Sequence, residues 1–154
     1  MTTLEKDIKR LIDNEIKELN ITSNSCDITK CIGKYFAKHL KNNSIIALNG
    51  ELGSGKTAFV CGFASYFNIE NEVSSPTFTI VNEYSNNIYH FDVYKLKSED
   101  EFLTTIGDEY FENGICIIEW ANIIKNILPK KTIFIDISKD SKNSDIRNLH
   151  IWRK

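Results

Sequence analysis

A glycine-rich loop between an apolar run and a helical stretch constrains the fold of this chain most strongly. Residues 50–57 read Gly-Glu-Leu-Gly-Ser-Gly-Lys-Thr and fill the pattern G-x-x-x-x-G-K-[ST] at every fixed position. The apolar run Ser44–Asn49 precedes this loop, and the helical-looking stretch 58–67 follows it. Such a loop needs a strand that leads into it and a helix whose free N–H groups face a phosphate. The order predicts a nucleotide phosphate site, against the alternative of an unliganded Gly-rich turn.

The composition of the 154 residues is typical of one globular domain. A net charge of −2 argues against a protein that binds nucleic acid or a membrane surface by itself. The chain has no run of 18 apolar residues, and charged residues over positions 5–10 exclude a signal-peptide core there. The four cysteines lack C-x-x-C spacing, so neither a disulfide framework nor a zinc site is expected. We therefore expect a cytoplasmic protein.

Residues 1–15 are expected to form a helical extension in front of a single P-loop domain, residues 16–154. Thr-Thr-Leu-Glu at positions 2–5 resembles a capping box, and apolar residues recur on one helical face behind it. Residues 16–22 fit either a continuation of this helix or a strand. The local pattern leaves both possibilities open.

A second helix should begin at Ser25 or Asp27, since both residue types cap helices. The segments 77–84 and 88–94 are rich in β-branched and aromatic residues, which predicts a hairpin. The apolar run 115–118 is typical of a buried central strand. The remaining expected elements are a helical region over 98–111 broken by Gly107, a short helix over 122–128, and strands over 132–138 and 148–152. Together they predict a three-layer α/β/α fold of the P-loop NTPase type, with a mixed central sheet that includes an antiparallel hairpin.

A phosphate-binding loop of this kind needs particular side chains beside it. Lys56 should reach the β- and γ-phosphates, and the Thr57 hydroxyl should bind Mg²⁺. Glu119 and Asp92 each follow an apolar strand, where a carboxylate is costly unless a metal ion satisfies it. The alternative for each acid is a strand end that faces water. The predicted catalytic residues are Lys56, Asp92 and Glu119, and the predicted metal ligands are Thr57, Asp92 and Glu119.

Ser75, Pro76 and Thr77 belong to the hydroxyl-rich segment 74–79, which either senses the nucleotide, like a switch loop, or is a strand-entry turn. Trp120 follows Glu119 directly and is interpreted as a core or interface aromatic in preference to a base-stacking platform. His90 is interpreted as a core histidine, with a role in the site as the alternative.

Four blocks of this sequence, taken in order, resemble the TsaE family of bacterial ATPases in tRNA threonylcarbamoyladenosine biosynthesis. The blocks are the loop 50–57, Ser-Pro-Thr-Phe-Thr-Ile at 75–80, Tyr-His-Phe-Asp-Val-Tyr at 89–94, and Ile-Glu-Trp at 118–120. The resemblance covers about residues 16–152. It implies an α/β/α P-loop fold that binds ATP and Mg²⁺ and hydrolyses ATP weakly on its own. It also implies work in complex with the TsaB and TsaD proteins.

The resemblance further implies that Lys56, Thr57, Asp92 and Glu119 form the nucleotide and metal site, and that Thr29 lies near the adenine. The expected nucleotide contacts are Thr29, Gly50, Glu51, Leu52, Gly53, Ser54, Gly55, Lys56, Thr57 and Ala58. In the family a Tyr-Arg pair follows the His-x-Asp block, whereas this chain has Tyr94-Lys95 at that position. Lysine lacks the planar, two-pronged guanidinium of arginine, so a bidentate contact is not expected there. The low net charge indicates that any tRNA contact is made jointly with other subunits, and no membrane contact is expected.

A small-molecule or nucleotide kinase is the main alternative function. Such kinases clamp the transferred phosphate with several arginines, whereas this chain has only Arg10, Arg147 and Arg153, none in an obvious lid. A GTPase is disfavoured because the chain has no Asn-Lys-x-Asp motif. A binding module that keeps a nucleotide without turning it over is the third possibility.

Overall fold

The computed structural model of the chain describes residues 1–76 and 79–154, over which helices and strands alternate. Short 3₁₀ helices are labelled η. In chain order the elements are α1 (Thr3–Ile12), β1 (Glu18–Ser23), α2 (Cys26–His39), β2 (Ser44–Asn49), α3 (Lys56–Tyr66), η1 (Glu70–Glu72), β3 (Val81–Tyr84), β4 (Ile88–Asp92), α4 (Glu99–Thr105), η2 (Glu109–Glu112), β5 (Ile115–Glu119), η3 (Ala121–Ile127), β6 (Ile133–Lys139) and β7 (Arg147–Arg153).

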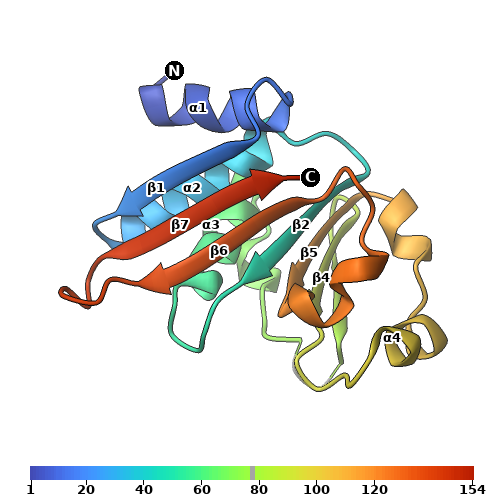
Figure 1. The fold of residues 1–154 in the computed structure, drawn as a ribbon. Coiled ribbons are helices and arrows are strands. Elements are labelled where there is room, and N and C mark those ends of the chain that lie inside the picture. Colours follow the sequence, from blue (N-terminus) through green and yellow to red (C-terminus); the bar gives the residue numbers. More distant parts are fainter. Residues whose placement is uncertain (77–78) are drawn as a thin grey trace.

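The strands of these described residues form one mixed, seven-stranded sheet in the order β1-β7-β6-β2-β5-β4-β3 (Figure 1). Its centre is parallel, because β2 pairs with β6 and β5, and β5 pairs with β4, all in the same direction. Its two margins are antiparallel, through the β3–β4 hairpin on one side and through β7 and β1 on the other. The prediction of an α/β fold with a mixed sheet and a hairpin is confirmed.

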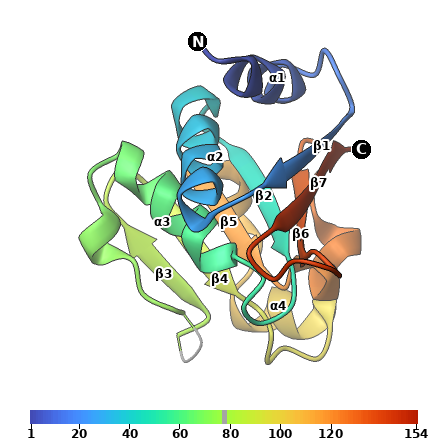
Figure 2. The same cartoon turned by 90° about the vertical axis from the view of Figure 1, so that its left-hand side faces the viewer.

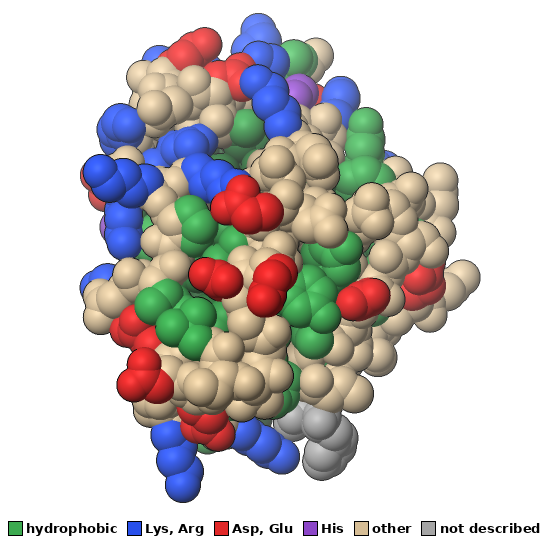
Figure 3. Space-filling view, turned by 90° about the vertical axis from the view of Figure 1, so that its right-hand side faces the viewer, with side chains coloured by type: hydrophobic (Ala, Val, Ile, Leu, Met, Phe, Trp, Pro, Cys, Tyr) green, Lys and Arg blue, Asp and Glu red, His purple; other side chains and the backbone are tan. Residues whose placement is uncertain are grey.

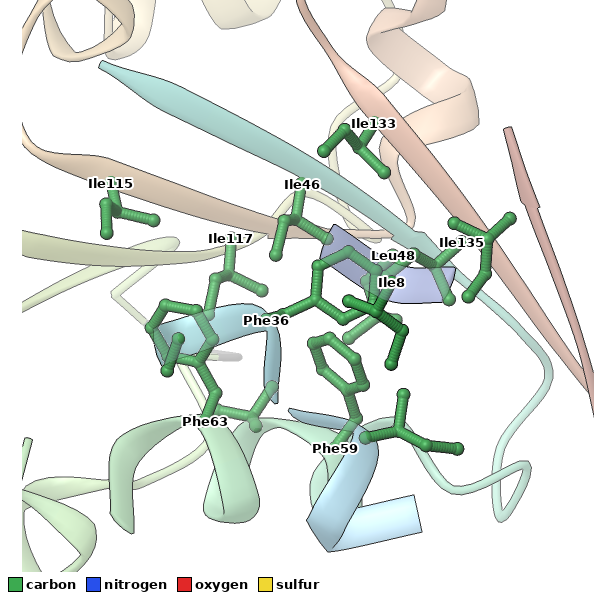
Figure 4. Close-up of a cluster of buried hydrophobic side chains, with 14 of the residues drawn as sticks. Ile8, Phe36, Ile46, Leu48, Phe59, Phe63, Ile115, Ile117, Ile133 and Ile135 are labelled. Atoms are coloured by element: carbon green, nitrogen blue, oxygen red, sulfur yellow. The ribbon is translucent and has the colours of Figure 1, made fainter. Parts of the chain in front are cut away.

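Helices cover both faces of the central strands, so the fold has three layers. Successive side chains of a strand point to opposite faces. In β2, Ile46 and Leu48 therefore pack with α1, α2 and α3, whereas Ile45 and Ala47 pack with residues of α4, η2 and η3. Figure 2 shows α2 and α3 side by side on one face, and Figure 4 shows Phe36, Phe59 and Phe63 meeting the isoleucines of the sheet. Every residue of β5 is buried, as expected for a central strand.

Several local predictions are decided by the structure. Residues 16–22, for which two structures were open, include the start of strand β1. Ser25, and not Asp27, caps α2, since its side chain accepts a hydrogen bond from the Ile28 amide. In the hairpin, Asn86 and Asn87 have φ of +67° and +57°, the left-handed conformation that tight hairpin turns need. The short helix expected over 122–128 is the 3₁₀ helix η3, and the first hairpin strand begins at Val81.

Helix α1 is tied to the rest of the molecule at both of its ends. Thr2 caps its start by accepting from the Glu5 amide, as the capping-box pattern predicts. The Glu5 carboxylate does not complete the box but contacts Lys38 (2.9 Å) and His39 (2.8 Å) on α2. Arg153 of β7 donates to the Ile12 carbonyl (2.6 Å) at the other end. Over the described residues, no helix is both long enough and apolar enough to cross a membrane.

Two glycines let α2 and α3 pack unusually closely. A Cβ at Gly33 of α2 would lie 2.1 Å from the Phe59 carbonyl oxygen, and one at Gly62 of α3 would lie 1.9 Å from the Lys30 carbonyl oxygen. Real Cβ atoms essentially never approach another atom within 3.0 Å, so a side chain at either position would force the backbones apart. This close contact fixes α3, the helix that begins at the glycine-rich loop.

Candidate functional site

The predicted site residues gather where the parallel strands end. Strand β2 ends at Asn49 and leads directly into the loop 50–57. Asp92, the last residue of β4, and Glu119, the last residue of β5, are paired in register. Because alternate residues of a strand share a face, His90 and Asp92 lie on the same face of the sheet as Glu119. The carboxyl edge of parallel strands is the usual position of a ligand site in open α/β sheets.

The glycines of the loop have conformations or contacts that other residues resist. Gly53 and Gly55 have φ of +78° and +112°, where side chains are strained. A Cβ at Gly50 would lie 2.4 Å from the Ser54 hydroxyl oxygen. Gly55 is the N-cap of α3 and has no side chain to cap it, so the first N–H groups of the helix remain available to a ligand. The pattern that dominates the sequence is therefore explained by backbone geometry.

The loop, the start of α3 and the two strand-end acids line one cavity of about 460 Å³. This cavity will be called the loop cavity. It joins elements far apart in the sequence, and it contains the predicted lysine, threonine, aspartate and glutamate together. Its lining residues are Leu52, Gly53, Ser54, Gly55, Lys56, Thr57, Val60, Cys61, Val73, Ser74, Ser75, His90, Asp92, Glu119 and Trp120. Among the predicted contacts, Gly50 and Glu51 line a neighbouring cavity that shares Leu52 and Ser54, and Ala58 lines another that shares Gly55.

Lys56 is a buried ammonium surrounded by acceptors. Its Nζ donates to the carbonyl oxygens of Gly50 and Glu51, the latter at 3.2 Å, and lies 4.6 Å from the centre of the Trp120 ring. Burial lowers the pKa of the Lys56 ammonium, and the negative charges of Glu119 and Asp92 oppose that shift. A cation held among loop carbonyls and an aromatic face is well placed to meet an anion in the cavity.

Asp92 is a half-buried carboxylate with an unusual environment. Its Oδ1 accepts a hydrogen bond from the Tyr94 amide (3.0 Å), which orients the side chain. Burial raises the pKa of the Asp92 carboxyl, and the nearby charge of Glu119 adds to the rise, although the Tyr94 hydrogen bond acts against it. Perturbed acids in a cavity are candidates for function, since structural carboxylates are seldom buried without a cation partner.

Glu119 is held by a histidine that sequence reasoning assigned to the core. His90 is 3% exposed, and its Nε2 lies 2.7 Å from Glu119 Oε2. Its Nδ1 lies 2.9 Å from the Tyr84 hydroxyl. His90 is therefore buried as expected, but it also lines the loop cavity. Tyr84 was missed altogether, because only the pairing of β3 with β4 brings it next to His90.

A second cavity of about 450 Å³ lies on the other side of Gly55, and we call it the flank cavity. Thr29 lines it, although the Thr29 hydroxyl is already 2.8 Å from the Ser23 hydroxyl. Arg147 also lines it and donates to the Gly53 carbonyl oxygen (3.3 Å). The sequence offered no signal for Arg147, because its contact with the loop depends on β7 lying in the sheet.

The predicted switch segment is described in part. Ser75 lines the loop cavity and Pro76 is buried, whereas Thr77 lies outside the described residues. At the end of the segment, Ile80 has φ of +68°, which is strained for a β-branched residue, and its carbonyl oxygen accepts from the Asp92 amide (2.8 Å). Trp120 also has a positive φ, +60°, and its ring packs on Tyr94 with centres 4.7 Å apart. Trp120 thus forms a wall of the cavity.

The acids of the cavity do not make a metal site on their own. Across residues 1–76 and 79–154, no group of three His, Cys, Asp or Glu side chains is arranged to hold a metal ion. Mg²⁺ typically binds through one or two carboxylates together with substrate phosphates and water. Glu119, Asp92 and the Thr57 hydroxyl fit that pattern and do not fit a metal held by protein alone.

Comparison with known proteins identifies relatives over most of the chain. The family model described as "Threonylcarbamoyl adenosine biosynthesis protein TsaE" matches residues 23–149. A TsaE protein of Bacillus subtilis (strain 168) is 40% identical over 128 residues, 80% of each chain. A TsaE protein of Rickettsia prowazekii (strain Madrid E) is 36% identical over 133 residues, which cover 84% of this chain and 92% of the relative. The crystal structure of YdiB from Bacillus subtilis superposes with a TM-score of 0.69 at 32% identity, over 89% of this chain and 86% of that one.

Proposed function

Since the chain belongs to the TsaE family of tRNA threonylcarbamoyladenosine biosynthesis proteins, we propose that it is an ATP-binding and ATP-hydrolysing subunit that acts with TsaB and TsaD in forming N6-threonylcarbamoyladenosine on tRNA. One observation carries the proposal. Lys56, Thr57, Asp92 and Glu119, from three separate elements, line a single cavity at the start of α3. Each has the chemistry that a magnesium-bound triphosphate requires.

The loop offers a triphosphate several donors, one of which, the Lys56 ammonium, already has acceptors in the Gly50 and Glu51 carbonyl oxygens. The Ser54 hydroxyl oxygen is buried and has no hydrogen-bond partner among the described residues. A buried hydroxyl without a partner is costly, and a phosphate oxygen would satisfy it. The amides at the start of α3 and the Lys56 ammonium would donate to the same anion. Binding of a triphosphate should therefore remove the cost of the unpaired Ser54 hydroxyl as well as create new hydrogen bonds.

The flank cavity is the side of the loop that we assign to the nucleoside. It shares Gly55 with the loop cavity, so a nucleotide lying over the loop would extend from one cavity into the other. Its walls combine the Thr29 and Ala58 side chains with the guanidinium of Arg147. A planar guanidinium stacks on a base or pairs with a phosphate equally well.

Thr57, Asp92 and Glu119 are the residues that would hold Mg²⁺ beside the phosphates. The bound ion would neutralise charge on the phosphate oxygens. The Lys56 ammonium would neutralise further phosphate charge from the same cavity. Asp92 is the group that we assign to orient the attacking water or accept its proton. Its Oδ1 is oriented by the hydrogen bond from the Tyr94 amide (3.0 Å), and Asp92 lines the loop cavity, where such a water would lie.

Partner proteins are expected to complete the site, because its mouth exposes large apolar side chains. Leu52, at the tip of the loop, is 92% exposed, and Tyr94 beside Trp120 is 58% exposed. The face in Figure 3 has acidic side chains across its middle and Lys and Arg side chains along its upper left and lower edges. Together with the net charge of −2, this mixed face supports a tRNA contact made through the assembled complex.

Phosphate release from ATP, measured for the full chain alone and with TsaB and TsaD, tests the proposal. We expect the chain alone to release phosphate slowly and the complex with TsaB and TsaD to release it faster. Lys56→Ala should abolish phosphate release in both cases. Lys130→Ala, which removes an exposed lysine elsewhere, is the matched control and should leave both rates unchanged. Unchanged turnover in Lys56→Ala would overturn the site. ATP binding without turnover in any mixture would favour a binding module, and phosphate transfer to a small acceptor would favour a kinase.

A further inference from the structure

A chain of hydrogen bonds crosses the sheet from the switch segment to Glu119. The Ser74 amide lies 3.2 Å from the Tyr84 hydroxyl oxygen, and that hydroxyl lies 2.9 Å from His90 Nδ1. His90 Nε2 lies 2.7 Å from Glu119 Oε2. Both ends of this chain, Ser74 and Glu119, line the loop cavity. We call Tyr84 and His90 the relay, because they connect the two cavity residues.

The donors in this chain can be assigned by chemistry. An ionised Glu119 only accepts, so the proton of a neutral His90 ring is on Nε2. Nδ1 of that ring is then an acceptor and takes the proton of the Tyr84 hydroxyl. The Tyr84 oxygen in turn accepts from the Ser74 amide. The Ser74 carbonyl oxygen, 3.0 Å from the Tyr84 oxygen, is a second acceptor for the same hydroxyl proton. With a neutral His90 ring the proton is needed at Nδ1, and the three bonds then run in one direction toward the carboxylate and strengthen one another.

Burial makes this arrangement stiff. His90 is 3% exposed, and Tyr84 and Glu119 are each 9% exposed, so water cannot easily replace a lost partner. Ser74 is held a second time, because the Asn82 amide donates to the Ser74 carbonyl and hydroxyl oxygens, both at 3.2 Å. A histidine that only supports the core needs a hydrogen-bond partner, but that partner need not be a residue that lines the cavity, as Glu119 does. The relay instead joins a segment that lines the loop cavity to a predicted metal ligand.

We propose that Tyr84 and His90 are positioning residues, which hold the Glu119 carboxylate in one orientation and couple it to the position of the Ser74 segment. The proposal rests on the proposed ATPase function, because it assigns Glu119 to the reaction. It predicts that the relay governs the catalytic step and leaves nucleotide binding to the loop. Residues that orient a metal ligand typically change metal affinity or activity about 10- to 100-fold when they are replaced.

Tyr84→Phe isolates the relay, because it removes one hydroxyl and keeps the ring. We expect kcat for ATP hydrolysis in the TsaB–TsaD complex to fall about tenfold, with KM for ATP within about twofold of wild type. Tyr110→Phe is the matched control, because its hydroxyl also makes a side-chain hydrogen bond, to the Glu83 carboxylate at 3.2 Å, but outside the cavity. Equal kcat in Tyr84→Phe and Tyr110→Phe would overturn the proposal.

His90 provides a second test with a conservative variant. His90→Gln keeps an amide donor that can reach Glu119, whereas His90→Leu leaves the carboxylate without its partner. We expect His90→Gln to retain several times the kcat of His90→Leu, at similar KM for ATP. Equal losses of kcat in the two variants would show that His90 acts only by filling space. Thermal unfolding of both variants establishes that each is folded when its rate is measured.

An observation that needs no turnover separates this proposal from the ATPase assignment. The chain has three histidines, so the ring nitrogens of His90 are readily assigned by ¹⁵N NMR. The relay predicts a His90 ring protonated on Nε2, and an Nδ1 signal that shifts in Tyr84→Phe while His39 and His150 stay unchanged. A ring protonated on Nδ1, or an unshifted signal, would overturn the relay even if ATP is hydrolysed. A wild-type protein that shows this NMR result but never hydrolyses ATP would contradict the proposed function instead.

Discussion

Replacing Gly33 with alanine should destabilise the protein, although alanine is the better helix former. Gly33 lies inside α2, where a Cβ would be 2.1 Å from the Phe59 carbonyl oxygen and 2.9 Å from the Phe63 amide nitrogen. Ordinary contact begins at 3.4 Å, so the Phe59 oxygen would have to retreat by 3.4 − 2.1 = 1.3 Å. Both atoms belong to the backbone of α3, so no side-chain rotation can relieve the clash.

The size of the effect follows from two opposing contributions. Alanine instead of glycine in a helix interior gains about 1 kcal/mol. Overpacking a well-packed core costs about 1–3 kcal/mol, or more when backbone must move. Because the clash is with backbone, the upper end of that cost, about 3 kcal/mol, applies here. We therefore expect a net decrease of about 2 kcal/mol in the free energy of unfolding, measured by urea titration with circular dichroism. Because Phe59 lies near the start of α3, the same displacement should also weaken ATP binding at the loop.

An exposed position next to Gly33 supplies the control. Lys34 is exposed on α2, so a side chain there meets no neighbouring backbone. The free energy of unfolding of Lys34→Ala should therefore exceed that of Lys34→Gly by about 1 kcal/mol, the difference in helix propensity between alanine and glycine. At position 33, by contrast, changing glycine to alanine should lower the free energy of unfolding. If Gly33→Ala instead raises the free energy of unfolding by the amount seen at Lys34, the close packing of α2 on α3 is wrong.

Three further predictions concern single side chains. The hydrogen bonds from Lys38 and then His39 lower the pKa of the Glu5 carboxyl in the folded protein. The stability that the ionised carboxylate contributes is therefore fully present above the ordinary pKa of 4.5 and is lost as the pH falls from there through the lowered pKa. Urea titrations should show that acidification destabilises Glu5→Gln less than wild type. Burial raises the pKa of the Cys116 thiol to about 12, so a thiol reagent at pH 8 should modify exposed Cys26 well before Cys116, as followed by mass spectrometry. Arg147→Ala should weaken ATP binding roughly tenfold, about 1.4 kcal/mol by calorimetry, and an unchanged affinity would exclude the flank cavity as the nucleoside side.

The parallel centre of the fold was predictable because its signals are local. Strand β2 has the predicted limits, Ser44–Asn49, since an apolar run followed by a glycine loop fits few other structures. Residues 16–22 were undecided because their structure depends on pairing with β7 at the far end of the chain. Similarly, the apolar pattern of 122–128 does not distinguish an α-helix from the observed 3₁₀ helix.

The residues of the candidate site also fall into those that a local sequence pattern predicts and those that only the fold brings together. Lys56 and Thr57 belong to a contiguous motif, and Asp92 and Glu119 were predicted to lie near them because each ends an apolar strand. The remaining side chains have no local signal. Tyr84 reaches His90 through the β3–β4 pairing, and the contact of Arg147 with Gly53 requires β7 to be in the sheet. Sequence patterns thus identify residues that share an element, and contacts between elements require the fold.

A crystal structure of the protein with Mg²⁺ and a non-hydrolysable ATP analogue at saturating concentration is the most direct test of the central claim. The account predicts that the phosphates lie within hydrogen-bonding distance of the loop amides of residues 53–57, the Lys56 ammonium and the Ser54 hydroxyl. It also predicts the metal ion beside Thr57 on the side of Glu119 and Asp92. A nucleotide bound elsewhere, or none bound under these conditions, would contradict it.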